Sequence, residues 1–93
     1  MVTAIVNLKV ERSKVNEVAN QLSGMEGITE VFSISGRFDL LAIIRVENNE
    51  QIADIVTGHM LKIEGIIDSE TSLAFKCYSE HDLASMFTIG MEE

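Results

Sequence analysis

The sequence has no proline, no tryptophan and only one cysteine, Cys77, among its 93 residues. A single thiol excludes an internal disulfide and supplies no metal cluster, so we expect Cys77 to be a buried core residue. No apolar run approaches the roughly 20 residues that span a bilayer, since the longest covers residues 40–44. The N-terminal segment also lacks the pattern of a secretion signal. We therefore expect a soluble, cytoplasmic protein with no membrane contact.

Positive charge is scarce as well. Seven lysines and arginines stand against 15 aspartates and glutamates, which gives a formal net charge of −8. The seven are scattered, and only residues 9–14 hold three of them. An acidic chain without a basic patch repels a phosphate backbone, so we expect no direct binding to nucleic acid. The length suffices for one compact domain, which we place at residues 1–78, followed by a tail at 79–93.

Regular apolar patterns, by contrast, run along most of the chain. Alternation of apolar and polar side chains with a period of two is typical of half-buried strands. This alternation and the flanking turn residues predict four strands, at residues 2–10, 28–35, 38–47 and 66–78. The Gly36-Arg37 pair suits a tight turn, so we expect the second and third strands to form an antiparallel hairpin.

Two other stretches carry apolar residues at the i, i+3, i+4, i+7 spacing of one helix face. We expect a cap by Ser13 to start the first helix and Gly24 to end it. The second helix should begin at a cap by Asn49 and end at Gly65. A capping signature at Ser79 predicts a short helix in the tail. The element order predicts an α+β, ferredoxin-like βαββαβ sandwich, with a four-stranded antiparallel sheet and two helices on one face.

The second face of the predicted sheet is unusually apolar. In a monomer the face that the helices leave uncovered should be polar. Here Ile5, Leu41 and Ile43 fall on that face. We therefore predict a sheet-to-sheet homodimer with these three residues in its interface. The alternative is that the tail helix covers this face within one chain.

Side chains suited to catalysis or metal binding are sparse. His59 lies on the apolar side of the second predicted helix, where we expect a partly buried residue. His81 follows Cys77 by four residues, a spacing too weak to indicate zinc. Carboxylates such as Glu30 and Asp39 are typical of solvated strands, and no glycine-rich phosphate loop precedes a helix. We predict no catalytic residue, no metal and no cofactor.

Two segments carry motifs, residues 32–41 (FSISGRFDLL) and residues 63–71 (IEGIIDSET). The first resembles the Ser-Gly-x-x-Asp hairpin of the effector-binding domain in the leucine-responsive and asparagine (Lrp/AsnC) regulator family. The second resembles that family's Pro-Gly-Val-x-x-Thr-x-Thr entry into its last strand, although Glu64 replaces the proline and Ser69 the first threonine. With the order of elements, the resemblance covers about residues 2–78.

The resemblance implies dimers that pack through their sheets and assemble into rings, with an amino acid held between neighbouring dimers. Carried over to this sequence, the effector site consists of Gly36, Arg37, Asp39, Ser69, Thr71 and Ser72. Gly36 lets backbone N–H groups approach an α-carboxylate, and Asp39 can accept from an α-ammonium. Hydroxyls at Ser69 and Thr71 complete the polar shell. Asp39 could alternatively hydrogen-bond local backbone in the hairpin.

Family members that bind DNA carry an N-terminal helix-turn-helix, whereas this sequence starts at the first strand, so we expect a stand-alone effector-binding domain. Its predicted function is to sense an amino acid or related small molecule, through oligomeric assembly and association with full-length regulators of the family. One alternative is a small dimeric ferredoxin-like enzyme resembling cofactor-free monooxygenases, which need a roomy cavity with aromatic lining. Another is an architectural protein that docks through apolar residues in the tail, at 86–91.

Overall fold

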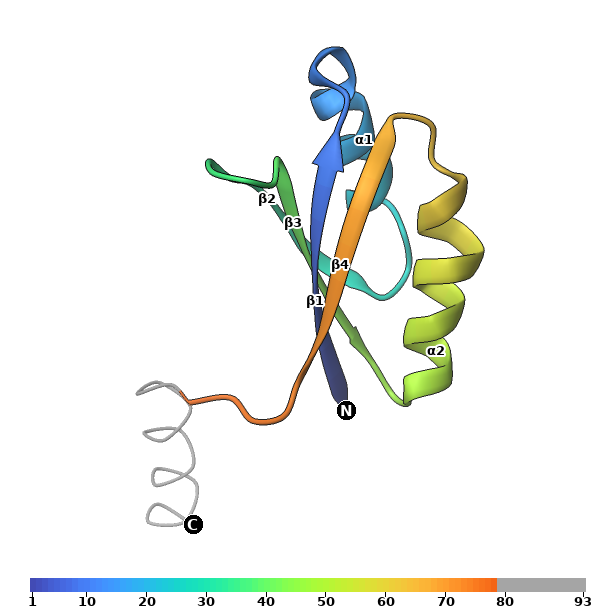
Figure 1. Cartoon of the computed structure of the whole chain (residues 1–93). Helices are drawn as coiled ribbons and strands as arrows, with labels where there is room; N and C mark the ends of the chain where they lie inside the picture. Colours follow the sequence, from blue (N-terminus) through green and yellow to red (C-terminus); the bar gives the residue numbers. More distant parts are fainter. Residues whose placement is uncertain (79–93) are drawn as a thin grey trace, which may run out of the picture.

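The alternating apolar residues of the N-terminal segment form strand β1 (Val2–Val10), which lies inside a four-stranded sheet (Figure 1). The computed structural model describes residues 1–78. β1 pairs with β3 (Leu40–Val46) on one side and β4 (Ile66–Ala74) on the other, and β2 (Ile28–Ser33) pairs with β3. All pairings are antiparallel, and the order is β2-β3-β1-β4. β2 and β4 are therefore the edge strands.

Two helical segments connect the strands. The first is α1 (Val15–Ser23), which follows a 3-10 turn, η1 (Arg12–Lys14). The second begins as α2 (Asn49–Ala53), continues as the π-helical η2 (Asp54–His59) and ends as the 3-10 turn η3 (Met60–Lys62). No helix within residues 1–78 combines the length and apolar character that crossing a membrane requires. The element order confirms the predicted α+β, ferredoxin-like fold.

The core lies between one face of the sheet and the helices. Paired residues of antiparallel strands share a face, so the even-numbered residues of β1 point the same way as the even-numbered residues of β3. The buried core of the described chain consists of Ala4, Val6, Leu8, Val10, Val18, Leu22, Ile28, Leu40, Ala42, Ile44, Ile52, Ile55 and Met60. These side chains are aliphatic apart from one methionine, and no aromatic ring is among them. Their removal from water is the main favourable term in folding.

The two predicted helix caps are wrong. Asn48 rather than Asn49 caps the second helix, because Asn48 Oδ1 accepts a hydrogen bond from Gln51 N at 3.0 Å. Gln51 Oε1 in turn accepts from Asn48 N at 3.2 Å. Ser13 lies inside η1, and no side-chain cap hydrogen bond is made at the start of η1 or α1. The N-cap is the last residue before the helix with an extended backbone, and Asn48 has that conformation. The sequence alone does not show which of two adjacent asparagines is extended.

The connection between β2 and β3 is longer than the tight turn predicted at Gly36-Arg37. The two strands are joined by a six-residue loop, 34–39. Ile34 N donates a hydrogen bond to Asp39 O at 3.0 Å, which closes the base of the loop. Gly36 has a φ of 109°, a conformation that glycine adopts without strain. The predicted hairpin is therefore present, but with shorter strands and a wider loop.

The end of β4 corrects two further predictions. β4 stops at Ala74, which pairs with Thr3 near the start of β1, and so ends earlier than predicted. Cys77 lies past this end and is exposed rather than buried in the core. His59 is also exposed, at the end of η2, rather than partly buried. The predicted tail helix falls within residues 79–93, outside the described residues.

Candidate functional site

The loop 34–39 and the first half of β4 lie on either side of β1, at the end of the sheet where β1 stops (Figure 1). Leu8 links them, since it pairs with Leu40 of β3 on one side and with Ser69 of β4 on the other. Asp39 N donates a hydrogen bond to Leu8 O at 2.8 Å, which fixes the loop against β1. The two segments that carry the sequence motifs therefore flank one strand end.

The carboxylate of Asp39 extends this attachment beyond the paired strands. Val10 follows the last residue pair of β1 with β3, and the β1–β4 pairing shifts register between Lys9 and Val10. Asp39 Oδ2 accepts a hydrogen bond from Val10 N at 2.8 Å in this half-buried place. The side chain thus supplies an acceptor that the strand pairing no longer provides. Asp39 anchors the loop to a strand that is distant in sequence, not to local backbone.

Arg37 connects the loop directly to β4. Its Nη2 lies 3.4 Å from Oε2 of Glu70, and the two side chains are 79% and 58% exposed. The guanidinium also lies over the ring of Phe38, 5.1 Å from the ring centroid. Glu70 pairs with Asn7 of β1, on the sheet face that the helices leave open. The pair therefore bridges the two motif segments at the surface.

The predicted effector residues are distributed over three places, the loop and the two faces of β4. These residues are Gly36, Arg37, Asp39, Ser69, Thr71 and Ser72. The first three lie in the loop. Ser69 and Thr71 pair with buried residues of β1 and share the helix-covered face, whereas Ser72 pairs with Ile5 on the open face. Asp39 and Ser69 are half-buried, and the other four are exposed.

Glu70 is the charged residue near the loop that the motif does not identify. The motif concerns the hydroxyl positions 69 and 71, which face the helices. Strand alternation places Asp68, Glu70 and Ser72 together on the opposite face. This period of two indicates from the sequence that Glu70 shares a face with Ser72. Glu70 could therefore have been identified as a candidate if the position of the 34–39 loop beside that face had been known.

The turn that enters β4 is fixed to η1, the 3-10 turn before α1. Gly65 O accepts a hydrogen bond from Glu11 N at 2.8 Å, and Gly65 has a φ of 108°. Lys14 Nζ lies 3.1 Å from Glu64 Oε1. The hydrogen bond and charge of Glu64 raise the pKa of Lys14 above its ordinary value of 10.5. The family's proline position is thus occupied here by an ion-pairing residue.

The sheet face away from the helices is largely apolar. Ile5 of β1 pairs with Ile43 of β3, and Leu41 of β3 pairs with Phe32 of β2. Ile5, Leu41 and Ile43 are half-buried, and Phe32 is 47% exposed. We call this surface the open face. It brings together the three residues predicted to form a dimer interface.

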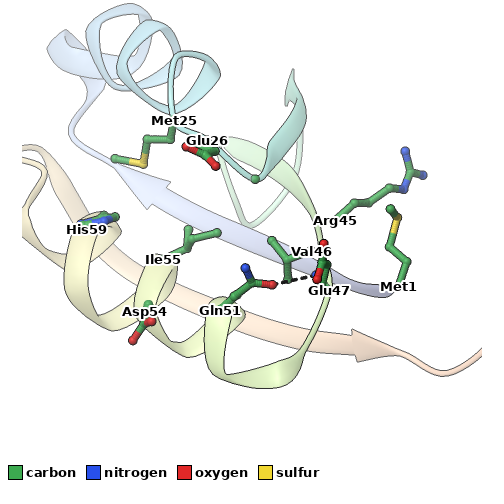
Figure 2. Close-up of a pocket in the computed structure, with 11 residues that line it drawn as sticks. Met1, Met25, Glu26, Arg45, Val46, Glu47, Gln51, Asp54, Ile55 and His59 are labelled. Carbon is green, nitrogen blue, oxygen red and sulfur yellow. Dashed lines mark hydrogen bonds between the residues drawn. The ribbon is translucent and has the colours of Figure 1, made fainter.

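Two surface hollows lie toward the other end of the sheet. One of about 680 Å³ is bounded by the 25–27 turn, the end of β3 and the second helix (Figure 2). Figure 2 shows Asp54 and His59 projecting from that helix, and Gln51 Oε1 accepts a hydrogen bond from Glu47 N at 2.8 Å. A second hollow of about 650 Å³ lies on the open face beside Ile5. Neither contains a predicted effector residue, so within one chain the candidate effector site is an exposed surface.

No cluster of three or more histidine, cysteine, aspartate or glutamate side chains in residues 1–78 is arranged to hold a metal ion. The chemistry that the loop and β4 do offer is charge and hydrogen bonding. Arg37 presents a cation, Glu70 an anion, and the neighbouring strand contributes hydroxyls. Such groups suit recognition of a small polar molecule.

The structure therefore defines a small ferredoxin-like domain with a surface candidate site between a loop and an edge strand. Residues 3–84 match the family described as the Lrp/AsnC ligand binding domain. The match covers most of the sequence, and the chain belongs to this family. The resemblance found in the two motifs is thus confirmed at the level of the whole domain.

Individual relatives agree with this assignment. PH1916 of Pyrococcus horikoshii, an uncharacterized HTH-type transcriptional regulator, is 34% identical over 64 residues, which are 69% of this chain and 43% of that protein. The crystal structure of TTHA0845 from Thermus thermophilus is 32% identical, with a TM-score of 0.81, and the match covers 86% of this chain and 100% of that chain.

One solved relative is a ligand complex. The transcriptional regulator NMB0573 from Neisseria meningitidis, solved with L-Met, shares the fold at 16% identity with a TM-score of 0.76. That match covers 85% of this chain and 53% of the other. The chain spans about half the length of the curated relatives it matches. The family is therefore one of transcription regulators, and this chain corresponds to its ligand-binding part.

Proposed function

We propose that this chain senses an amino acid or a closely related small molecule and acts on transcription through protein assembly rather than by contacting DNA itself. The observation that carries the proposal is the contact between the 34–39 loop and β4, within a chain that matches a ligand-binding family over residues 3–84. The L-Met complex of the Neisseria regulator supports an amino acid as the class of effector.

The proposed effector site combines the loop with the start of β4. Gly36 is exposed at a positive φ, with no heavy atom within 4 Å of where a Cβ would lie. Backbone N–H groups beside it are accessible to an α-carboxylate, and Arg37 adds a cation. Ser69 and Thr71 supply hydroxyls on one face of β4 and Ser72 on the other. Asp39 keeps the loop in place through Val10 N.

The proposed site needs a second subunit to enclose its ligand. In one chain these residues lie at the surface, and binding sites for small molecules bury most of the ligand. The open face, with Ile5, Leu41 and Ile43, is the surface we propose for sheet-to-sheet dimerisation, and dimers then form a higher oligomer. Related chains named as HTH-type regulators are the proposed partners for mixed assembly.

We propose a binding protein rather than an enzyme. A monooxygenase of this fold needs a roomy cavity with aromatic side chains, whereas the core of the described chain is filled with aliphatic residues. Curated relatives of this chain are named as HTH-type transcriptional regulators, which supports a binding protein.

A thermal-shift screen of the 20 common amino acids tests this proposal. A ligand present at a hundred times its Kd adds about 2.7 kcal/mol to the free energy of unfolding. For a domain of this size that corresponds to a rise in Tm of roughly 10–20 °C. Arg37→Ala should abolish the rise. Arg12→Ala removes another exposed arginine, which lies in η1 and outside the loop, β4 and the open face, and should retain the rise.

Two outcomes would overturn the proposal. One is the absence of a shift with all 20 amino acids at concentrations up to about 100 mM, far above the Kd of a working sensor. The other is a shift that persists unchanged in the Arg37→Ala protein, which would place the ligand somewhere other than the loop.

A further inference from the structure

The ion pair between Arg37 and Glu70 is the only charged contact among residues 1–78 that joins the loop to β4. Both side chains are more than half exposed, and their closest atoms are 3.4 Å apart. An ion pair this accessible adds little to folding stability, so it can open at low cost when a ligand competes for its members. Its position, rather than its strength, is what matters for recognition.

The chemistry of an α-amino acid matches the two members of this pair. Such a molecule carries a carboxylate and an ammonium on the same carbon atom. The guanidinium of Arg37 presents a planar array of donors suited to a carboxylate. Its contact with the Phe38 ring keeps it near the loop. The Glu70 carboxylate can accept from an ammonium. When a zwitterion lies between them, its carboxylate takes the place of Glu70 beside Arg37. Its ammonium takes the place of Arg37 beside Glu70.

Asp39 is less available for this role than Glu70. The Asp39 carboxylate already accepts a hydrogen bond from Val10 N at 2.8 Å and is half-buried against β1. Releasing it would leave a backbone N–H without its acceptor, which is costly in a partly buried place. The Glu70 carboxylate has no backbone partner to abandon, because its one side-chain hydrogen bond within residues 1–78 is with Arg37.

Building on the proposed function, we propose that Glu70 is a specificity-determining residue that recognises the α-ammonium, while Arg37 recognises the α-carboxylate. Glu70 then discriminates against compounds that lack the amino group. A carboxylic acid with the same side chain still binds Arg37, but it displaces Glu70 and leaves two carboxylates close together. An amine without the carboxylate leaves Arg37 in contact with Glu70 and gains nothing from the loop.

Calorimetric titration of the full chain tests this assignment with three probes. These are the amino acid that binds best among the common 20, the same compound without its amino group, and the same compound without its carboxylate. The wild type should bind the amino acid about tenfold or more tightly than either analogue. Glu70→Gln should weaken binding of the amino acid about tenfold and should not weaken binding of the deaminated acid.

Glu50→Gln is the matched control. Glu50 is also an exposed carboxylate, but it lies in α2, outside the loop, β4 and the open face. This change should leave all three affinities unaltered, and both variants should melt close to the wild type because the carboxylates are exposed.

The possible failures are distinguishable. If the wild type binds none of the 20 amino acids, the proposed function and the role of Glu70 both fail. If it binds one and Glu70→Gln binds it equally well, only the role of Glu70 fails. The role of Glu70 also fails if Glu70→Gln lowers the affinity for the amino acid and for the deaminated acid by the same factor. Such a result would indicate general damage to the site.

Discussion

At the scale of single residues, three glycines differ in backbone conformation and in the space around them. Comparing them distinguishes the cost of a positive φ from the cost of steric crowding. Gly27 has a φ of 93°, and a Cβ there would lie 2.6 Å from Ile55 Cδ1 and 3.0 Å from Val46 Cγ1. Gly36 has a φ of 109° and open space around it. Gly58 lies in the second helix with neither constraint. Because Gly27 has no side chain, the turn before β2 can pack closely against Ile55 of the second helix.

Alanine substitution should therefore have graded effects on the free energy of unfolding in urea. We expect Gly27→Ala to lose about 3 kcal/mol, from strain and overpacking together. Gly36→Ala should lose about 1 kcal/mol from strain alone. Gly58→Ala should gain roughly 0.5–1 kcal/mol, because alanine is the better helix former. Equal losses at Gly27 and Gly36 would contradict the crowding seen at Gly27.

At the scale of elements, the start of the second helix depends on one of two adjacent asparagines. Asn48 makes the reciprocal hydrogen bonds with Gln51, whereas Asn49 is already inside α2. Asn48→Ala should lower the free energy of unfolding by about 1 kcal/mol. Asn49→Ala should change it by less than about 0.5 kcal/mol. Chemical denaturation of both variants checks this, and a larger loss at Asn49 would reinstate the cap expected from the sequence.

The stabilisation from the ion pair between Lys14 of η1 and Glu64, in the turn before β4, should be lost at alkaline pH. The pKa of Lys14 is raised by Glu64, so folding favours the protonated lysine. The stabilisation is complete below the unfolded pKa, near 10.5, and is lost as pH rises through the higher folded value. We expect Glu64→Gln to be less stable than the wild type at about pH 9 and equally stable above the folded pKa.

Urea midpoints of both proteins at about pH 9 and at rising pH above the ordinary lysine pKa of 10.5 measure this difference. Glu50→Gln, which removes an exposed carboxylate that makes no ion pair within residues 1–78, serves as the control for general charge effects. A constant difference between the wild type and Glu64→Gln across this range would show that Lys14 titration is not responsible.

At the scale of the whole molecule, the open face determines the expected assembly. Leu41 lies in its middle, where it pairs with Asn7 on one side and Phe32 on the other. A lysine at this position would bury a charge in any sheet-to-sheet interface, which is strongly unfavourable. We expect Leu41→Lys to sediment as a monomer of about 10.3 kDa, while the wild type forms a dimer or larger species.

Sedimentation equilibrium at micromolar concentration gives the answer directly. Ala53→Lys adds the same charge to the exposed surface of α2 and should leave the assembly intact. A monomeric wild type would remove the basis for a ligand site closed by a second subunit. A dimer that survives in Leu41→Lys would move the interface to another surface.

The sequence was sufficient to predict the fold, because periodicity is a local property. The even-numbered apolar residues of β1 and the helical spacing of residues such as Ile52 and Ile55 each identify an element from its own residues. Local patterns were less reliable at the ends of elements. The choice between Asn48 and Asn49, the width of the 34–39 loop and the exposure of Cys77 depend on neighbouring strands and helices.

The candidate site shows the same division between local and tertiary information. The motifs predicted Arg37 and the hydroxyls of β4 as site residues, but the strand pairing showed that Ser72 faces away from Ser69 and Thr71. Only the tertiary structure joined Asp39 to Val10 and Arg37 to Glu70, across 29 and 33 residues of sequence. These contacts exist because β1 pairs with both β3 and β4, and no pattern confined to one segment records which strands become neighbours.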